Sequence, residues 1–218
     1  MTSGKRQLAS GALAGGEQFE YNYDDIGNRT STKAGGDASG NNLRVANYSA
    51  NTVNQYTSRD VPGSVWVVGD AATNLALQGM AEGRPFAIQR QDGQRFFGEG
   101  VVSNGQSAVF AKVIVAGKAS GMLNDVEIGH RFVPQTPEAF GYDADGNQTS
   151  DGRFAYVWDA ENRLVSLTSL SAAPSASKRG WILPMIIKAG ACRKLFRFGT
   201  AWLTLPNPPT GSCMTVGT

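Results

Sequence analysis

One stretch of the chain has the residue types and spacing of a cation site. Asp143, Asp145, Asn147 and Asp151 place oxygen-bearing side chains at intervals around Gly146. Calcium takes about six to eight oxygen ligands, and a common calcium loop alternates acidic residues before a glycine. The stretch therefore predicts either a calcium site or a tight turn in which the first aspartate caps the backbone.

Catalytic chemistry has little support elsewhere in the sequence. His130 is the single histidine, and no serine stands in the G-x-S-x-G frame that exposes a nucleophile. Cys192 and Cys213 lie too far apart, with too few partner ligands, for a zinc motif. The adjacent carboxylates Asp24 and Asp25 fall in a predicted turn, where capping suits them better than acid–base chemistry. With no phosphate-binding loop or dinucleotide fingerprint, we predict no enzymatic activity and no cofactor.

Three segments share one frame, in which an aromatic residue and Asp precede two variable residues, Gly or Asn, and a polar residue. They are Tyr23-Asp24-Asp25-Ile26-Gly27-Asn28-Arg29, Tyr142-Asp143-Ala144-Asp145-Gly146-Asn147-Gln148 and Trp158-Asp159-Ala160-Glu161-Asn162-Arg163-Leu164. Gly and Asn best tolerate a positive φ, so the shared position predicts a left-handed turn residue. The position of Asp145 is Ile26 in the first copy and Glu161 in the third. Since a metal role would keep oxygen ligands there, the comparison favours the turn.

Aromatic residues alternate on both sides of these turns. The rows are Phe19, Tyr21 and Tyr23, then Phe140 and Tyr142, then Phe154, Tyr156 and Trp158. A spacing of two predicts strands with one aromatic face. Such faces could stack on sugars, with Tyr21, Tyr156 and Trp158 as the candidates, or pack on a neighbouring hairpin. We favour packing, because a single hairpin is marginally stable and needs neighbours.

A different block lies between the repeats, at about residues 62–133. It alternates short runs rich in Val, Ile and Phe with the turn pairs Asp92-Gly93 and Asn104-Gly105, a hairpin signal. We interpret it as a small β-sandwich inserted into the repeats. The 27 Gly, 9 Pro and 17% charged residues agree with an all-β chain of short strands. The predicted parts are repeat hairpins at 1–61, the insertion at 62–133, repeat hairpins at 134–170 and a tail at 171–218.

The repeats resemble the YD repeats of the bacterial Rhs (rearrangement hotspot) family, which animal teneurins share. The resemblance covers residues 19–60 and 134–170, and it rests on three motifs in register. The residues of the motifs, all expected to be structural, are Tyr23, Asp24, Gly27, Asn28, Arg29, Tyr142, Asp143, Gly146, Asn147, Trp158, Asp159, Asn162, Arg163 and Leu164.

The resemblance implies a fold in which YD hairpins join into a strip that spirals into a hollow β-shell around a C-terminal toxin or other cargo. The expected partners are the remainder of that shell or its cargo, and the expected place of the parent is the cell envelope or outside the cell. Family cores end beside a self-cleaving aspartate site, and no matching segment is found here. The alternative is an adhesion module that binds carbohydrate or calcium.

The tail after Leu170 differs in character from the rest of the chain. Residues 171–218 hold six basic residues, no acid and both cysteines. Reading one base out of frame, Met185 followed by Ile186 must give Asp, and so must Met214 followed by Thr215. Each is preceded by a codon pair that allows Tyr. We therefore expect a frameshifted, poorly ordered tail that makes the chain a fragment of a longer protein.

No purpose is assigned to the basic residues of this tail, and nucleic-acid binding is not expected. The N-terminal residues lack the apolar run of a signal peptide, so none is predicted. The apolar run from Trp181 to Ile187 is too short to span a bilayer, and no membrane span is predicted.

Overall fold

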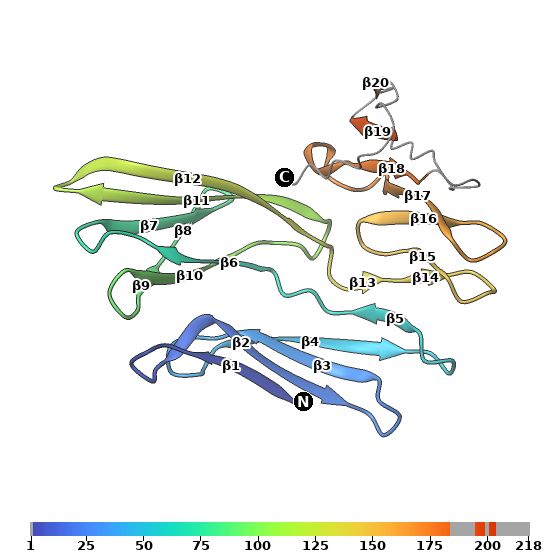
Figure 1. Ribbon diagram of the computed structural model, residues 1–218, viewed down its shortest axis with the longest axis horizontal. Helices are drawn as coiled ribbons and strands as arrows, with labels where there is room; N and C mark the ends of the chain where they lie inside the picture. Colours follow the sequence, from blue (N-terminus) through green and yellow to red (C-terminus); the bar gives the residue numbers. More distant parts are fainter. Residues whose placement is uncertain (1, 184–194, 199–200, 204–218) are drawn as a thin grey trace, which may run out of the picture. The chain divides into compact units, whose positions relative to one another are not determined.

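The computed structural model describes residues 2–183, 195–198 and 201–203 of the chain (Figure 1). Within these ranges the regular elements are antiparallel β-strands and one short 3-10 helix, η1 (Ser175–Ser177). The all-β prediction is confirmed. The chain forms two compact units, Met1–Ala139 and Phe140–Thr218, which are described separately. The four-part division at residues 61, 133 and 170 stays a prediction.

The first unit contains a six-stranded antiparallel sheet that grows mostly by consecutive hairpins. Its strands lie in the order β1-β2-β3-β4-β5-β13. Their bounds are β1 (Ser3–Gln7), β2 (Leu13–Tyr23), β3 (Arg29–Gly35), β4 (Leu43–Ala50), β5 (Tyr56–Arg59) and β13 (Glu138–Ala139). The chain leaves this sheet after Arg59 and returns at Glu138, which lies directly opposite Arg59. Strands β6 to β12 therefore come between two neighbouring strands of one sheet.

Those intervening strands form a small β-sandwich. One sheet has the order β6-β10-β9 and the other β12-β11-β7-β8. The bounds are β6 (Ser64–Asp70), β7 (Ala76–Ala81), β8 (Arg84–Phe86), β9 (Ile88–Arg90), β10 (Arg95–Val101), β11 (Val109–Ala119) and β12 (Met122–Val133). Alternate residues of facing strands supply the shared core, which consists of Val65, Ala81, Val102, Ala111, Val113 and Val133. This is the alternation expected for strands buried on one face.

The six-stranded sheet packs against the sandwich where β2 meets β10. The approach is close because Gly15 has no side chain: a Cβ atom there would lie 2.6 Å from the ring of Phe97. The Gly15 N–H donates to the buried Gln91 Oε1 at 2.9 Å. Glu17 on β2 pairs with Arg95 on β10 at 3.1 Å. These contacts make the sheet and the sandwich one unit.

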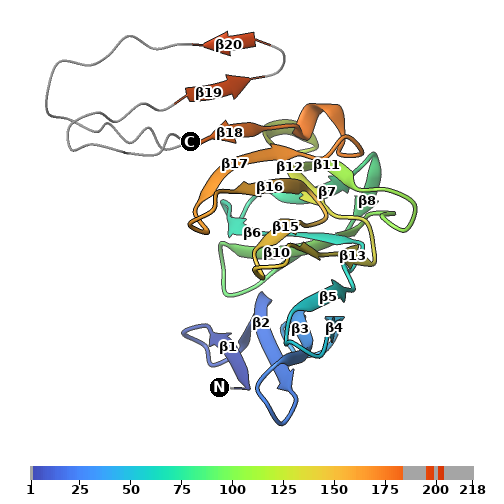
Figure 2. The same ribbon diagram turned by 90° about the vertical axis from the view of Figure 1, so that its right-hand side faces the viewer.

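The second unit is a seven-stranded antiparallel sheet in which strand order follows chain order, β14 to β20 (Figure 2). The bounds are β14 (Gly141–Tyr142), β15 (Gln148–Ser150), β16 (Phe154–Trp158), β17 (Leu164–Ser169), β18 (Gly180–Ile182), β19 (Leu195–Phe198) and β20 (Ala201–Leu203). Every strand is joined to the next one along the chain, so the sheet extends by adding hairpins at one edge.

The tail contains strands that the sequence did not predict. β18 pairs with β17, with Trp181 opposite Leu167, and the Trp181 and Phe154 rings meet edge to face at 5.8 Å. β19 and β20 continue the sheet. Strands β18, β19 and β20 thus lie within the predicted tail, and the irregularity of the tail beyond them stays a prediction. Residues 184–194, 199–200 and 204–218 lie outside the described residues, and with them Cys192, Cys213 and the two methionines of the frameshift argument.

Candidate functional site

The Asp143 turn is built around one carboxylate. Asp143 Oδ1 accepts hydrogen bonds from the backbone N–H groups of Asp145 at 3.1 Å and Asn147 at 2.8 Å. Asp143 Oδ2 accepts from the Asn147 side chain at 3.1 Å. The backbone closes the turn as well, since Asp143 N–H donates to Asn147 O at 3.0 Å. Gly146 has a φ of 87°, the left-handed conformation that its position requires.

In the described residues the same turn recurs at five positions. Each has a backbone bond from the first residue to the carbonyl of the fifth, and a side-chain oxygen of the first that accepts from the backbone of the third and fifth. The first residues are Asp24, Asp37, Asn51, Asp143 and Asp159. The fourth residue has a positive φ in every copy: Gly27, Gly40, Asn54, Gly146 and Asn162.

Two of these turns, at Asp37 and Asn51, were missed in the sequence analysis. They follow Gly36 and Ala50, so the aromatic residue that marks the other three is absent. The signal that would have found them is the shorter pattern of Asp or Asn followed three positions later by Gly or Asn.

Turns on alternate hairpins are joined to each other by side-chain amides. Asn147 Nδ2 donates to Asn162 Oδ1 at 2.8 Å, and Asn28 Nδ2 donates to Asn54 Oδ1 at 3.2 Å. In both cases the acceptor is the left-handed residue of the later turn. Asn therefore does something at this position that Gly cannot, because it tolerates the backbone and also supplies an acceptor.

The capping carboxylates are held in their ionised form. Desolvation would raise the pKa of Asp143, but hydrogen bonds from the Asn147 side chain and from backbone N–H groups outweigh it and place the pKa below its ordinary value. Against the same desolvation, the pKa of Asp24 is lowered by Asn28 and nearby backbone N–H groups. The pKa of Asp159 is likewise lowered by the backbone N–H groups of Arg163 and Glu161 and by the Arg163 guanidinium. Accepting several N–H bonds favours the charged form.

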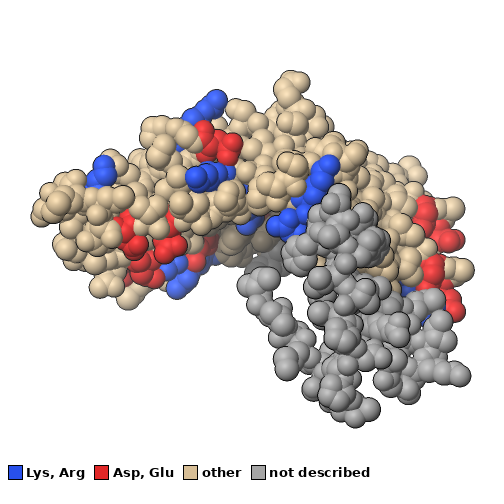
Figure 3. Space-filling model, turned by 90° about the horizontal axis from the view of Figure 1, so that it is seen from above, with Lys and Arg blue, Asp and Glu red and all other residues tan. Residues whose placement is uncertain are grey.

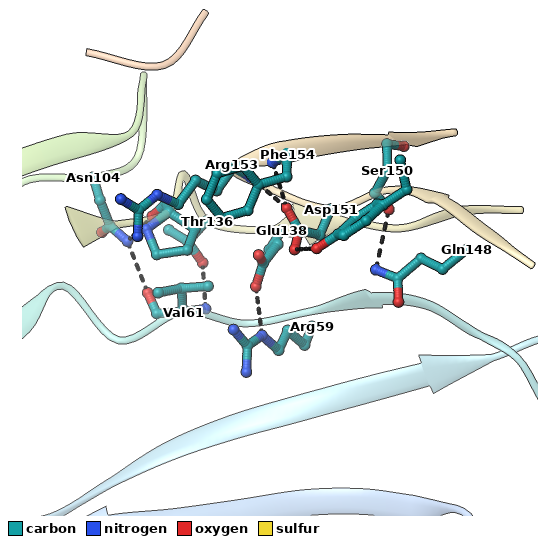
Figure 4. A network of polar contacts seen from close by, with 12 residues as sticks. Arg59, Val61, Asn104, Thr136, Glu138, Gln148, Ser150, Asp151, Arg153 and Phe154 are labelled. Carbon is teal, nitrogen blue, oxygen red and sulfur yellow. Dashed lines mark hydrogen bonds and ion pairs between the residues drawn. The ribbon is translucent and has the colours of Figure 1, made fainter. Parts of the chain in front are cut away.

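The four calcium candidates do not converge on one point. Asp143 caps its own turn, whereas Asp151 caps the next one, accepting from Arg153 N–H at 2.7 Å and Phe154 N–H at 2.6 Å (Figure 4). Asp151 Oδ2 also accepts from the Tyr156 hydroxyl at 2.5 Å. Among the residues that the structure describes, no cluster of three or more His, Cys, Asp or Glu side chains could hold a metal ion. The carboxylates of Asp143 and Asp151 thus each cap a turn, and a calcium role for this stretch stays a prediction.

The sugar-stacking candidates already take part in contacts within their sheets. The Arg29 guanidinium lies over the Tyr21 ring at 5.1 Å. Trp158 Nε1 donates to Gln148 O at 2.7 Å, and Tyr156 bonds to Asp151. Tyr156 and Trp158 are half-buried. These contacts are those of strands packing on their neighbours, and sugar stacking stays a prediction.

The remaining motif residues lie around the same turns. Tyr23 is opposite Arg29, Tyr142 opposite Gln148, and Trp158 opposite Leu164, each beside a local shift of register. His130 lies on β12, where its ring stacks on Phe110 with 5.1 Å between centroids.

A compact polar network joins the sandwich to the six-stranded sheet (Figure 4). Asn104 is 4% exposed, and its Nδ2 donates to Val61 O at 3.0 Å and Pro134 O at 2.8 Å. Val61 N–H donates to Thr136 Oγ1 at 3.0 Å. Arg59 pairs with the buried Glu138 at 2.5 Å. The two chain segments that enter and leave the sandwich are thus bonded to each other.

The sandwich also contains a cavity that the sequence analysis did not predict. Its volume is about 550 Å³, and it lies between β6 on one sheet and β11 and β12 on the other. Apolar lining comes from residues such as Val67, Phe96 and Val115, while Asp125, Glu127 and Arg131 line it from β12. This volume falls in the range of small-molecule sites. Only the pairing of distant strands creates it, so no local motif announces it.

No helix in the described residues is long and apolar enough to cross a membrane. On the face drawn in Figure 3, basic and acidic side chains lie beside one another at several places. Among the described residues, ion pairs that join opposite charges include Lys5 with Glu20 at 3.0 Å and Arg44 with Glu99 at 2.6 Å.

Comparisons with known proteins give one short similarity. A segment of 31 residues is 55% identical to the tRNA nuclease WapA of Bacillus subtilis (strain 168). The same identity and length hold for the tRNA3(Ser)-specific nuclease WapA of Bacillus spizizenii. The segment is 14% of this chain and 1% of either relative. No protein-family model and no solved structure matches the chain.

Proposed function

We propose that the chain is a structural part of an Rhs/YD-repeat protein, whose strip of hairpins encloses or presents a C-terminal toxin or other cargo at the cell envelope. The observation that carries the proposal is the recurring five-residue turn with its amide bond to the next turn on the same side. A repeated unit that bonds to its own next copy is how a long strip is built.

The sheet topology supports the same proposal. In the second unit each strand adds at the edge left by the strand before it. Such a sheet has no built-in limit to its length, because every added hairpin recreates the edge that the next one needs. The short similarity to WapA is compatible with a shared structural segment, since it covers 1% of those nucleases. The nuclease activity in their names is not transferred to this chain, which we propose to be non-catalytic.

The test begins with the gene. Codons 165–218 and the bases beyond them should be sequenced, and both reading frames examined for further Tyr-Asp repeats. If they are present, the repaired parent should be purified and imaged by electron microscopy, where a hollow particle that shields its C-terminal region from protease is expected. A parent without an enclosed volume would contradict the proposal, as would hydrolysis of tRNA by the chain itself.

A second candidate, a carbohydrate-binding adhesion module, is favoured by the cavity of the sandwich. Its apolar wall and the carboxylates of Asp125 and Glu127 would suit the faces and hydroxyl groups of a sugar. Glycan-array binding by the chain, lost on Phe96→Ala and kept in Phe19→Ala, would favour this candidate. A calcium-binding module would be favoured if adding calcium raised the Tm of the chain and if Asp145→Ala abolished that rise.

A further inference from the structure

Strand β12 is a long edge strand whose backbone is available for pairing. Lys112 on β11 directs both its backbone groups toward β7, since its carbonyl accepts from Glu82 N–H at 3.0 Å and its N–H donates to Glu82 Oε1 at 2.6 Å. His130 lies opposite Lys112. In an antiparallel ladder, His130, Ile128 and Val126 must therefore point their N–H and C=O groups away from β11. In the described part of the chain β12 pairs with β11 alone.

The side chains of this edge are exposed as well. Every residue from Met122 to Arg131 is exposed, including Val126 at 39% and Ile128 at 54%. The Val126 N–H donates to the neighbouring Asp125 carboxylate at 2.9 Å in place of a ladder partner. Natural edges are usually short, bulged or interrupted by proline. This one runs for 12 residues, and its register shift against β11, at Asn124, lies outside the stretch from Asp125 to Arg131.

The charges along β12 match a second copy of the same strand. Asp125, Glu127, Gly129 and Arg131 share the cavity side of the strand, because their partners Gly117, Val115, Val113 and Ala111 turn toward the sandwich core. Suppose that two copies run antiparallel with Ile128 opposite Ile128. Asp125 of each then faces Arg131 of the other, and Glu127 faces Gly129. Two ion pairs form by symmetry alone.

The backbone allows this register. Ile128 has outward N–H and C=O groups, so the symmetry axis passes through a hydrogen-bonded pair. The charged residues then fall at the non-hydrogen-bonded positions, where side chains of facing strands approach most closely. An axis at Glu127 would place two carboxylates opposite each other. An axis at Gly129 would pair Glu127 with Arg131, but it would also place Asp125 opposite Val133, which is buried.

We propose that the chain forms a two-fold dimer through antiparallel pairing of β12 with β12, with Ile128 on the axis, joining two four-stranded sheets into one. The alternative to dimerisation is that charged residues on the core side of this edge strand prevent it from pairing with other strands. Charges of one sign would do that best. The mixed order of acid, acid and then base places like charges opposite each other when the axis is at Val126, Glu127 or Arg131. The axis at Ile128 places opposite charges together and keeps Asp125 away from the buried Val133.

Sedimentation equilibrium of the full chain over a range of concentrations tests the proposal. We expect a dimer that dissociates on dilution. Asp125→Arg faces Arg131 of the other copy, and Arg131→Asp faces Asp125, so each should raise the dissociation constant about tenfold or more. The double variant D125R/R131D restores opposite charges and should recover dimerisation. Asp25→Arg, an exposed change of the same charge in a turn, is the matched control.

Two outcomes would overturn the proposal. One is a wild-type chain that stays monomeric up to its solubility limit. The other is a double variant that dimerises no better than either single variant. Thermal unfolding of all variants separates a lost interface from a lost fold, because the charge swap lies on an exposed strand and should leave Tm of the monomer close to that of the Asp25→Arg control.

Discussion

Replacing Asn104 with alanine should loosen the point where the sandwich joins the six-stranded sheet. The Asn104 amide is buried and donates to Val61 O at 3.0 Å and Pro134 O at 2.8 Å. Each such bond contributes about 0.5–1.5 kcal/mol net, so the loss of two lowers the free energy of unfolding by about 2 kcal/mol. For a chain of this size that corresponds to a fall in Tm of about 4–8 °C.

The assay is urea unfolding combined with amide hydrogen exchange measured by mass spectrometry. Exchange should speed up over residues 56–64 and 133–139, because the two segments that meet there lose their shared donor. Asn22→Ala is the control, since Asn22 is exposed and donates to Ser31 Oγ at 2.8 Å. It should change stability by about 0.5 kcal/mol or less. Equal behaviour of the two variants in both measurements would refute the reasoning.

A shape-conserving variant sharpens the test. Asn104→Asp replaces the donor with a carboxylate that faces the same two carbonyl oxygens. At neutral pH this should destabilise the chain more than alanine does, because a buried charge would meet two acceptors. Stability should recover in part as pH falls, since the protonated carboxyl can again donate to one carbonyl. A variant that is insensitive to pH would show that the amide donor is unimportant.

The capping carboxylates should make the chain sensitive to acid. In the folded chain the pKa of Asp143 lies below the ordinary 3.8, so its stabilising effect is complete well above that value and is lost as pH falls through the folded pKa. In urea titrations from neutral pH down to about pH 2, the free energy of unfolding should therefore decline less steeply for Asp143→Asn than for the wild type. Asn162→Gly keeps the left-handed backbone and removes the acceptor of the Asn147 amide, so exchange should quicken at both turns, whereas unchanged exchange would dismiss the amide link. Gly15→Ala should lower the free energy of unfolding by about 1–3 kcal/mol, because the added Cβ would lie 2.6 Å from the ring of Phe97. Gly4→Ala, which has open space around it, is the control and should leave stability nearly unchanged. If thermal unfolding shows no loss for Gly15→Ala, the close packing of β2 is contradicted.

The three turns marked by an aromatic residue could be read from sequence because their chemistry is local. Asp24, Asp143 and Asp159 bond to residues two and four positions away, so all participants lie in one short string of letters. The Asp37 and Asn51 turns use the same bonds. They were missed because the sequence pattern required an aromatic residue before the turn, and Gly36 and Ala50 stand there instead.

The rest of the structure depends on partners distant in sequence. No local sequence pattern marks the cavity or the polar network at Asn104. Residues 61, 104 and 134 are distant in sequence and are brought together only by the pairing of the strands between them. β18 was missed for a related reason. The residues around Trp181 do not alternate between apolar and polar. Its strand forms because it pairs with the edge of β17 and because the Trp181 ring packs against the ring of Phe154.

The return of the chain at Glu138, opposite Arg59, has a consequence for how such a protein can change through time. Two antiparallel strands can pair whenever the chain returns beside the strand that it left, whatever the length of the connection. A whole domain can therefore connect β5 to β13, where other pairs of strands are connected by a five-residue turn. Recombination at a turn can therefore exchange such cassettes without altering the register of the strands on either side. Each turn of such a sheet is then a place where a domain can be inserted while the strands on either side keep their pairing.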